Sequence, residues 1–270
     1  MKRSDFVKRL FPCILAILIV LAFGGCAEKE EVKFYETKSY VKHSTGDIDL
    51  RESTYDENWN LLLSYTTLNG NFASKTEYEY SEDFTVLTTK RTSAIYEPDT
   101  SKIIRSFDDK GQVIKAETYD GDRHISTAEY TYDDNGEMTY VRSTQPESNV
   151  VTTIQRIFDD KGNLVTYIQD TGFYVGRYEY SYNQKNQRIG EEYYRDDVLL
   201  DYVDFTWEGN VGTGTSYKAD GTPLGKQLLE YDDYGNLLRL ESQDLLGTTQ
   251  TVICYEYIGT DGTISSRIPE

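Results

Sequence analysis

The chain has few of the residues that most often carry enzyme chemistry. Its 270 residues include two histidines, three cysteines, two methionines, two tryptophans and five prolines. His43 and His124 lie outside any metal-ligand or nucleophile motif, and no phosphate loop, dinucleotide fingerprint, Gly-Xaa-Ser-Xaa-Gly or His-Glu-Xaa-Xaa-His sequence occurs. We therefore expect neither an enzyme nor a cofactor, and we assign no catalytic residue.

Cysteine use leaves no disulfide to predict in the main part of the chain. Cys13 and Cys26 belong to the N-terminal segment, so Cys254 stands alone in the rest. It lies in the apolar and aromatic stretch 252–257, and we expect a small buried side chain there rather than a reactive thiol.

Basic residues are also scarce relative to acidic ones. Lys and Arg total 28 against 46 Asp and Glu. Without residues 1–25, which hold four of the basic residues and one acidic residue, 24 basic and 45 acidic residues remain, a formal charge of −21. Such a surface repels nucleic acid and anionic lipid, so we expect no nucleic-acid partner. For most of these acids, keeping a long sheet soluble is a sufficient explanation.

What the chain has in abundance is tyrosine, 24 in all, and a repeated short motif. The clearest copy is 158–164, Phe-Asp-Asp-Lys-Gly-Asn-Leu. An aromatic residue begins each copy, and successive copies start 25, 27, 25, 26, 24, 25, 24 and 26 residues apart. The leading aromatic residues are Tyr55, Tyr80, Phe107, Tyr132, Phe158, Tyr182, Trp207, Tyr231 and Tyr257. A period held this closely indicates a repeat array.

Each copy predicts a tight hairpin turn. The first Asp can bond the backbone ahead of it, the middle pair suits a type I turn, and Gly supplies the left-handed residue of a bulged hairpin. A second reversal is expected near 120–122, 170–172 and 219–221. Each unit is then two strands of roughly ten residues, and nine units give about eighteen antiparallel strands.

Aromatic side chains two residues apart share one face of such a sheet, as in 178–182 and 253–257, while Glu129, Glu179 and Glu256 point the other way. We expect an all-β domain over 32–270, a long antiparallel meander whose accumulated twist makes it curl or spiral with the aromatic face inward. An eighteen-stranded outer-membrane barrel has compatible strand lengths. We favour the curled sheet because charged residues recur on every strand.

The motif resembles the YD repeat of the Rhs family, most closely at Tyr132–Gly136 and Tyr231–Leu237. In the large members these repeats wind as a spiralling antiparallel sheet that forms a hollow shell around a toxin segment. The resemblance covers about 48–262 and implies a curled, exported β-repeat protein at the cell surface. It does not imply the cargo role, because the long core sequence with its self-cleaving aspartates has no counterpart here.

The N-terminal segment differs from the repeats. Four basic residues precede the apolar run 14–23, which ends in Phe-Gly-Gly-Cys26. This resembles the lipobox of bacterial lipoproteins, which implies a signal peptide over 1–25, lipidation of Cys26 and a short linker over 26–31. An uncleaved anchor helix and a plain secretory signal are the alternatives. We expect an exported protein held to a membrane on the cell surface or the periplasmic side.

Two weaker sets of candidate residues remain. Asp133, Asp134 and Asn135 offer oxygen ligands for calcium, but no glutamate follows at the EF-hand distance, so we predict no metal site. Carboxylate pairs at turn tips are adjacent and copied, unlike a glycosidase pair. For function, we expect a surface scaffold that meets a protein partner or acts as a spacer. The alternative is a glycan-binding module that stacks sugars on exposed tyrosines, for which the candidates are Tyr130, Tyr178, Tyr180 and Tyr255.

Overall fold

The computed structural model describes residues 33–268, and this part of the chain is built from antiparallel strands. It contains no helix able to cross a membrane. The strands are β1 (Phe34–His43), β2 (Ile48–Tyr55), β3 (Leu61–Leu68), β4 (Asn71–Tyr80), β5 (Val86–Ser93), β6 (Asp99–Phe107), β7 (Val113–Asp120), β8 (Arg123–Tyr132), β9 (Met138–Gln145), β10 (Val150–Phe158), β11 (Leu164–Asp170), β12 (Val175–Tyr182), β13 (Arg188–Arg195), β14 (Val198–Glu208), β15 (Val211–Lys218), β16 (Pro223–Tyr231), β17 (Leu237–Gln243), β18 (Thr249–Gly259) and β19 (Ile264–Ser266).

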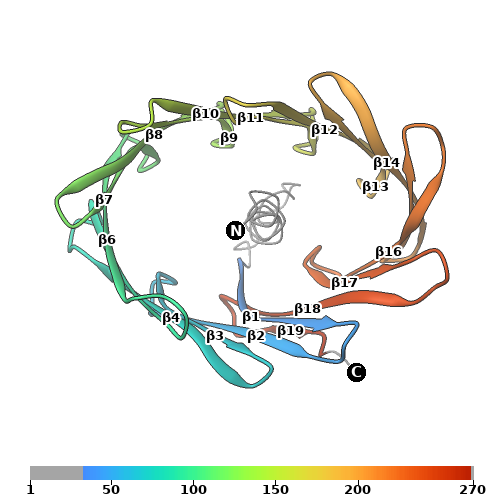
Figure 1. Ribbon diagram of the computed structural model, residues 1–270, viewed down its shortest axis with the longest axis horizontal. Helices are drawn as coiled ribbons and strands as arrows, with labels where there is room; N and C mark the ends of the chain where they lie inside the picture. Colours follow the sequence, from blue (N-terminus) through green and yellow to red (C-terminus); the bar gives the residue numbers. More distant parts are fainter. Residues whose placement is uncertain (1–32, 269–270) are drawn as a thin grey trace.

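The sheet closes on itself as a barrel (Figure 1). Each strand pairs with the next in the sequence, and β1 pairs with β18 along its length, from Phe34 opposite Gly259 to His43 opposite Thr251. The short β19 pairs with the far end of β18, beside β17. The barrel therefore has eighteen strands, with β19 as an addition to β18.

Closure corrects the expected open, curled or spiralling sheet. The all-β class, the antiparallel meander and the strand count are confirmed. The expectation failed at the ends of the sheet, because twist over eighteen strands brings β1 and β18 into pairing distance. Pairing satisfies the backbone groups that two free edges would leave open.

The predicted Asp-Gly turns are confirmed in detail. In the turn after β10, Asp159 Oδ1 accepts hydrogen bonds from the N–H groups of Lys161 and Asn163, at 2.9 and 2.8 Å. Gly162 has a φ of +82°, the left-handed conformation that the bulged hairpin requires. The strand register shifts at the aromatic residue, between Ile157 and Phe158. The same pattern recurs at Asp56, Asp108, Asp133 and Asp232.

The register defines two faces of the wall. The aromatic face carries Tyr78, Tyr130, Tyr178, Tyr180, Phe205, Trp207, Leu229, Tyr231, Tyr255 and Tyr257. The charged face carries Lys75, Glu77, Glu79, Lys90, Glu129, Arg142, Arg239, Glu241, Cys254 and Glu256. Glu129 and Glu256 thus lie on the charged face, pointing away from the aromatic side chains, as predicted.

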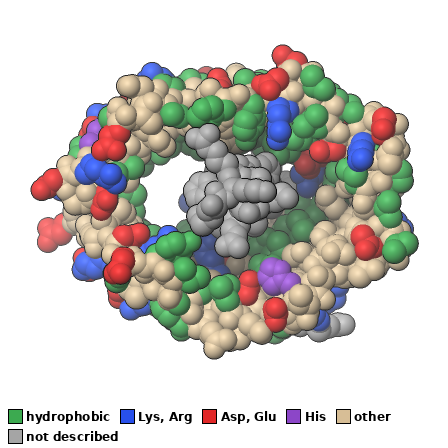
Figure 2. Space-filling view, in the orientation of Figure 1, with side chains coloured by type: hydrophobic (Ala, Val, Ile, Leu, Met, Phe, Trp, Pro, Cys, Tyr) green, Lys and Arg blue, Asp and Glu red, His purple; other side chains and the backbone are tan. Residues whose placement is uncertain are grey.

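The aromatic face lines the inside of the barrel. Charged-face residues of β17 and β18 share a pocket with Arg267 and Ile268, and Figure 1 shows the last described residues outside the ring. Figure 2 shows hydrophobic side chains along much of the visible inner wall. Curvature crowds side chains on the inside, which explains why most of the buried residues belong to the aromatic face.

The most tightly packed part of the inner wall lies on β14 to β17. Leu229 is 1 % exposed and packs in a cluster with Val203, Phe205 and Leu237. The large aromatic rings need space over the neighbouring strand that no side chain fills. A Cβ on Gly214 would lie 2.6 Å from the Phe205 ring, so glycine at this position lets the ring lie against the neighbouring strand.

The leading aromatic residue of the repeat also ties neighbouring hairpins together. The hydroxyl groups of Tyr55, Tyr132 and Tyr182 donate to the carbonyl oxygens of Glu36, Val113 and Leu164, at 2.8, 2.8 and 2.9 Å. Trp207 does the same with its ring N–H, which donates to the Arg188 carbonyl at 2.7 Å. A donor at this position therefore joins each of these units to the hairpin before it.

Removing one of these hydroxyl groups is expected to destabilise the barrel modestly. Burial raises the pKa of Tyr182 to about 12, so the hydroxyl keeps its proton and donates. The Tyr182→Phe substitution leaves the Leu164 carbonyl without that donor and should cost about 1 kcal/mol in urea unfolding. The exposed Tyr96→Phe is the control and should be neutral. Equal losses of stability in both variants would contradict a stabilising role for the hydrogen bond from Tyr182 to the Leu164 carbonyl.

Candidate functional site

A pocket of about 290 Å³ lies on the outer wall where the barrel closes. It is formed by the end of β1, the turn between β1 and β2, β17, β18 and the chain after β19. Its lining residues are Lys42, His43, Ser44, Gly46, Arg239, Glu241, Thr249, Val252, Cys254, Arg267 and Ile268. These come from both ends of the described chain, so only closure assembles them.

Glu241 is the buried charge of this pocket, with 6 % of its surface exposed. Its carboxylate accepts hydrogen bonds from Gln243 Nε2 and Thr249 Oγ1, both at 2.8 Å, and from Arg239 Nη2 at 2.5 Å. Burial alone would raise its pKa, but these three donors outweigh burial and hold the pKa below its ordinary value. The carboxylate is therefore ionised and occupied, which suits a structural anchor and not a proton-transfer group.

The remaining cations of the pocket are partly paired. Arg239 is committed to Glu241, and its Nε is buried without a hydrogen-bond partner in the described structure. Arg267 lies 3.7 Å from the Glu230 carboxylate and donates its backbone N–H to the Tyr255 carbonyl at 2.9 Å. The pocket joins the C-terminal segment to the wall by these contacts.

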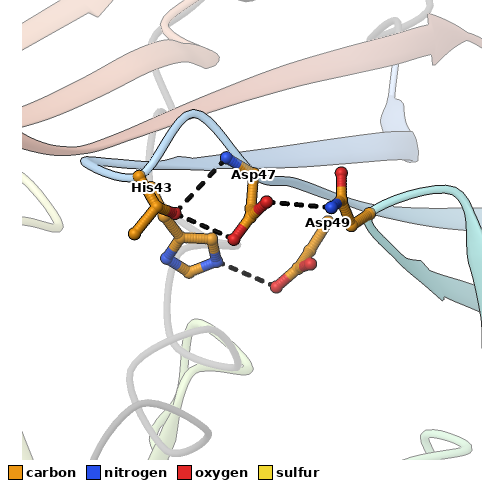
Figure 3. A network of polar contacts seen from close by, with 5 residues as sticks. His43, Asp47 and Asp49 are labelled. Atoms are coloured by element: carbon orange, nitrogen blue, oxygen red, sulfur yellow. Dashed lines mark hydrogen bonds and ion pairs between the residues drawn. The ribbon is translucent and has the colours of Figure 1, made fainter.

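A polar network holds the turn between β1 and β2 beside the pocket (Figure 3). His43 Nε2 lies 2.9 Å from Asp49 Oδ2, and the His43 backbone N–H donates to the Asp47 carbonyl at 2.9 Å. Asp47 Oδ1 accepts from Asn69 Nδ2 at 2.8 Å, which links this turn to the next one. The histidine is thus held in a contact that stabilises the turn.

The four tyrosine candidates are half-buried members of the inner aromatic face. Tyr178 stacks on Tyr193 with ring centroids 4.7 Å apart, and Tyr180 lies parallel to Tyr178 at 6.3 Å. Tyr255 stacks on Tyr257 at 6.1 Å. For Tyr130, burial raises the pKa of the hydroxyl. The structure brings Tyr178 and Tyr180 together, and their contacts are stacking contacts with other tyrosine rings of the wall.

The three calcium candidates form one of the repeated turns. Asp133 Oδ1 accepts from the N–H groups of Asn135 and Glu137, both at 2.9 Å, while Asp134 is exposed at the tip. Within residues 33–268, no three His, Cys, Asp or Glu side chains are grouped as metal ligands. The turn geometry accounts for Asp133 and for Gly136, whose φ is +87°.

The cysteine predictions have different outcomes. Cys254 is 1 % exposed on β18, and burial raises the pKa of its thiol, so the expected small buried side chain is confirmed. Cys26, the signal peptide over 1–25 and the linker over 26–31 lie outside the described residues, and lipidation stays a prediction. Lys42, Arg239, Glu241 and Arg267 were missed, because sequence alternation marks them only as outward-facing charges.

Comparison with known proteins adds little to this description. No protein-family model and no curated protein matches the chain. The crystal structure of TcdB2-TccC3-TEV matches with a TM-score of 0.27 and 12% identity, over 82% of this chain and 16% of that one. A porin-like protein from Bacteroides uniformis ATCC 8492 matches with a TM-score of 0.47 and 9% identity, over 85% of this chain and 96% of that one.

The chain therefore spans about a sixth of the TcdB2-TccC3 chain that it matches. Both TM-scores are low, so the account of the fold rests on the strand pairing itself. That pairing defines an all-β repeat fold.

Proposed function

We propose that this protein is an exported lipoprotein, anchored to a membrane through acylated Cys26, whose barrel is a scaffold for contact with a protein partner. The observation that supports it most is the outer wall. Ion pairs lie on it, with nitrogen to oxygen distances of 2.7 Å for Lys90 with Glu79 and 3.4 Å for Arg142 with Glu129. A lipid-facing wall needs an apolar band at this place.

The wall therefore suits water, and attachment to a membrane requires another part of the chain. The basic residues and apolar run before Phe23-Gly24-Gly25-Cys26 supply that part in the sequence. A single acyl chain binds reversibly and lipoprotein-type multiple acylation binds stably, so lipidation at one residue is enough to hold the barrel.

The finer assignment to the YD repeat is part of the same proposal. Support comes from the turn at Asp133 and Gly136 and from the hydroxyl of Tyr132, which bonds the preceding hairpin. Both residue types of the tyrosine-aspartate pair then have a structural role in the repeat. The stacked tyrosines of the inner wall have a packing role in this account, and we propose no glycan site.

Lipidation is tested by metabolic labelling. Cells that express the full chain with labelled palmitate are expected to label the protein and retain it in the membrane fraction. Cys26→Ser should abolish the label and release or mislocalise the protein, because no thiol remains for acyl transfer at that residue. Cys13→Ser and Cys254→Ser are matched controls and should keep the label. Label that persists in Cys26→Ser, or that never enters the native protein, would refute the anchor.

A further inference from the structure

One rim of the barrel gathers exposed hydrophobic side chains. Because the strands form an antiparallel meander, all nine connections from an odd-numbered strand to the next even-numbered strand lie at the same end of the barrel. We call this end the odd-to-even rim. Of the nine large hydrophobic side chains of residues 33–268 that are more than half exposed, six lie at this rim. They are Ile95, Tyr96, Phe173, Val198, Leu245 and Leu246.

In the turn between β17 and β18, the bonds that hold the turn do not involve the side chains of Leu245 and Leu246. Asp244 Oδ1 accepts from the N–H groups of Leu246 and Thr248, both at 2.9 Å, and Gly247 has a φ of +80°. The turn at 159–163 has the same geometry with Asp and Lys at the two tip positions. Polar residues therefore satisfy this turn, yet Leu246 is 92 % exposed.

Phe173 makes the same point in a different connection. The backbone between β11 and β12 is held by Asp170, which accepts from the Gly172 N–H at 2.7 Å, and by Thr171, whose N–H donates to the Tyr174 carbonyl at 3.1 Å. None of these bonds uses the Phe173 ring, which is 84 % exposed. Two independent turns thus carry large apolar side chains that their own geometry does not need.

Exposed apolar side chains stand at four neighbouring connections along one arc of the rim. Phe173, Val198 and the Leu245–Leu246 pair come from the connections after β11, β13 and β17, and Leu224, also exposed, begins near the connection after β15. These four connections are neighbours on the rim because the strands are neighbours in the sheet. An arc of this kind marks an interaction surface.

The connections of the odd-to-even rim are acidic, while Arg123, Arg195 and Lys218 stand at the strand ends beside them and Arg123 lies 3.7 Å from the Glu147 carboxylate. The nine connections themselves hold eight acidic residues and no lysine or arginine. The acidic residues are Asp47, Glu97, Asp122, Glu147, Asp196, Asp197, Asp220 and Asp244. A surface with apolar tips among carboxylates complements a partner with apolar side chains among cations, and it repels anionic lipid head groups.

We propose that the odd-to-even rim is a docking surface for a protein segment whose apolar side chains are flanked by lysine or arginine. The inference rests on the scaffold role proposed above and not on lipidation. The position of the rim agrees with it. β1 begins at the opposite end of the barrel, so the first described residue, Lys33, lies away from the odd-to-even rim.

The test uses a charge-neutral change that preserves the turn. Leu245→Asp with Leu246→Lys gives the turn the residue types of 159–162 and leaves the net charge unchanged. The probe is a fluorescent amphipathic peptide of leucine and lysine, about 18 residues long. All proteins are purified from cells expressing the full chain with Cys26→Ser, so that no acyl group contributes. Binding by anisotropy should be about tenfold weaker in the double variant, because an apolar anchor is lost.

Two further arms make the result specific. Asp160→Leu with Lys161→Leu, added to the double variant, places the leucine pair on the opposite rim and should not restore binding. Equal binding before and after the double change, no binding by the native sequence, or restoration from the opposite rim would each overturn the proposal. Flotation with phosphatidylcholine vesicles, or with vesicles containing phosphatidylglycerol, that disappears in the double variant would also overturn it in favour of a lipid surface.

Discussion

Leu229→Ala is expected to lower the free energy of unfolding by about 3 kcal/mol, the value typical of a fully buried leucine in a packed core. Leu229 is 1 % exposed on β16 and stands opposite Leu240 of β17 and Gly212 of β15. The glycine opposite has no side chain of its own, and the Trp207 ring already lies over it. The cavity should therefore stay open, and the cost should include the cavity as well as the lost apolar contact.

Urea unfolding followed by tyrosine and tryptophan fluorescence measures this loss, and a thermal midpoint about 8 °C lower is expected for a chain of this size. Leu246→Ala is the matched control. It removes the same atoms from a side chain that is 92 % exposed and should change stability by no more than a few tenths of a kcal/mol. A loss of under about 1 kcal/mol for Leu229→Ala would show that the cluster around Phe205 is not the core of the barrel.

The repeat itself was predictable because its signals are local. Asp159 and Gly162 encode a turn through bonds and dihedral angles that span five residues, and the structure reproduces them. The alternation of Tyr178, Glu179 and Tyr180 encodes which side chains share a face, and pairing with β13 keeps that assignment. Local rules of this kind need no knowledge of the remainder of the chain.

Closure could not be predicted in the same way. The pairing of Val41 with Ile253 joins residues 212 positions apart, and neither segment carries a turn or motif that identifies its partner strand. Strand twist determines whether the two ends of an eighteen-stranded sheet meet, and twist is a small quantity that accumulates over every strand. The outward-facing pocket could not be predicted either, because Lys42 and Arg239 line one pocket only when the sheet is closed.

The candidate side chains were predicted by type but not by surroundings. A tyrosine ladder is visible in the sequence, whereas the stacking of Tyr178 on Tyr193 depends on the register between β12 and β13. The hydroxyl bond from Tyr182 to the Leu164 carbonyl was also missed. The sequence does contain a signal for this bond, because the leading aromatic residue is of a type that can donate a hydrogen bond, Tyr or Trp, in most copies of the repeat.

A cysteine pair across the closure is expected to form a disulfide nearly completely under mild oxidation. Val41→Cys and Ile253→Cys place two thiols on directly opposite residues of β1 and β18, which both belong to the aromatic face. Opposite residues of antiparallel strands have Cα atoms about 4.5–5.5 Å apart, within the range that a disulfide spans. The bond would close a loop of more than two hundred residues and stabilise the barrel by up to about 5 kcal/mol.

Cross-linking is read from mobility on a non-reducing gel and from urea unfolding with and without reductant. All variants carry Cys254→Ser, which removes the neighbouring native thiol of β18. The control combines Val41→Cys with Ile154→Cys on β10, a strand that pairs with β9 and β11 and not with β1, and this pair should stay reduced. In an open spiral the two ends of the sheet lie apart, so an absence of cross-linking between positions 41 and 253 would mean that the barrel does not close.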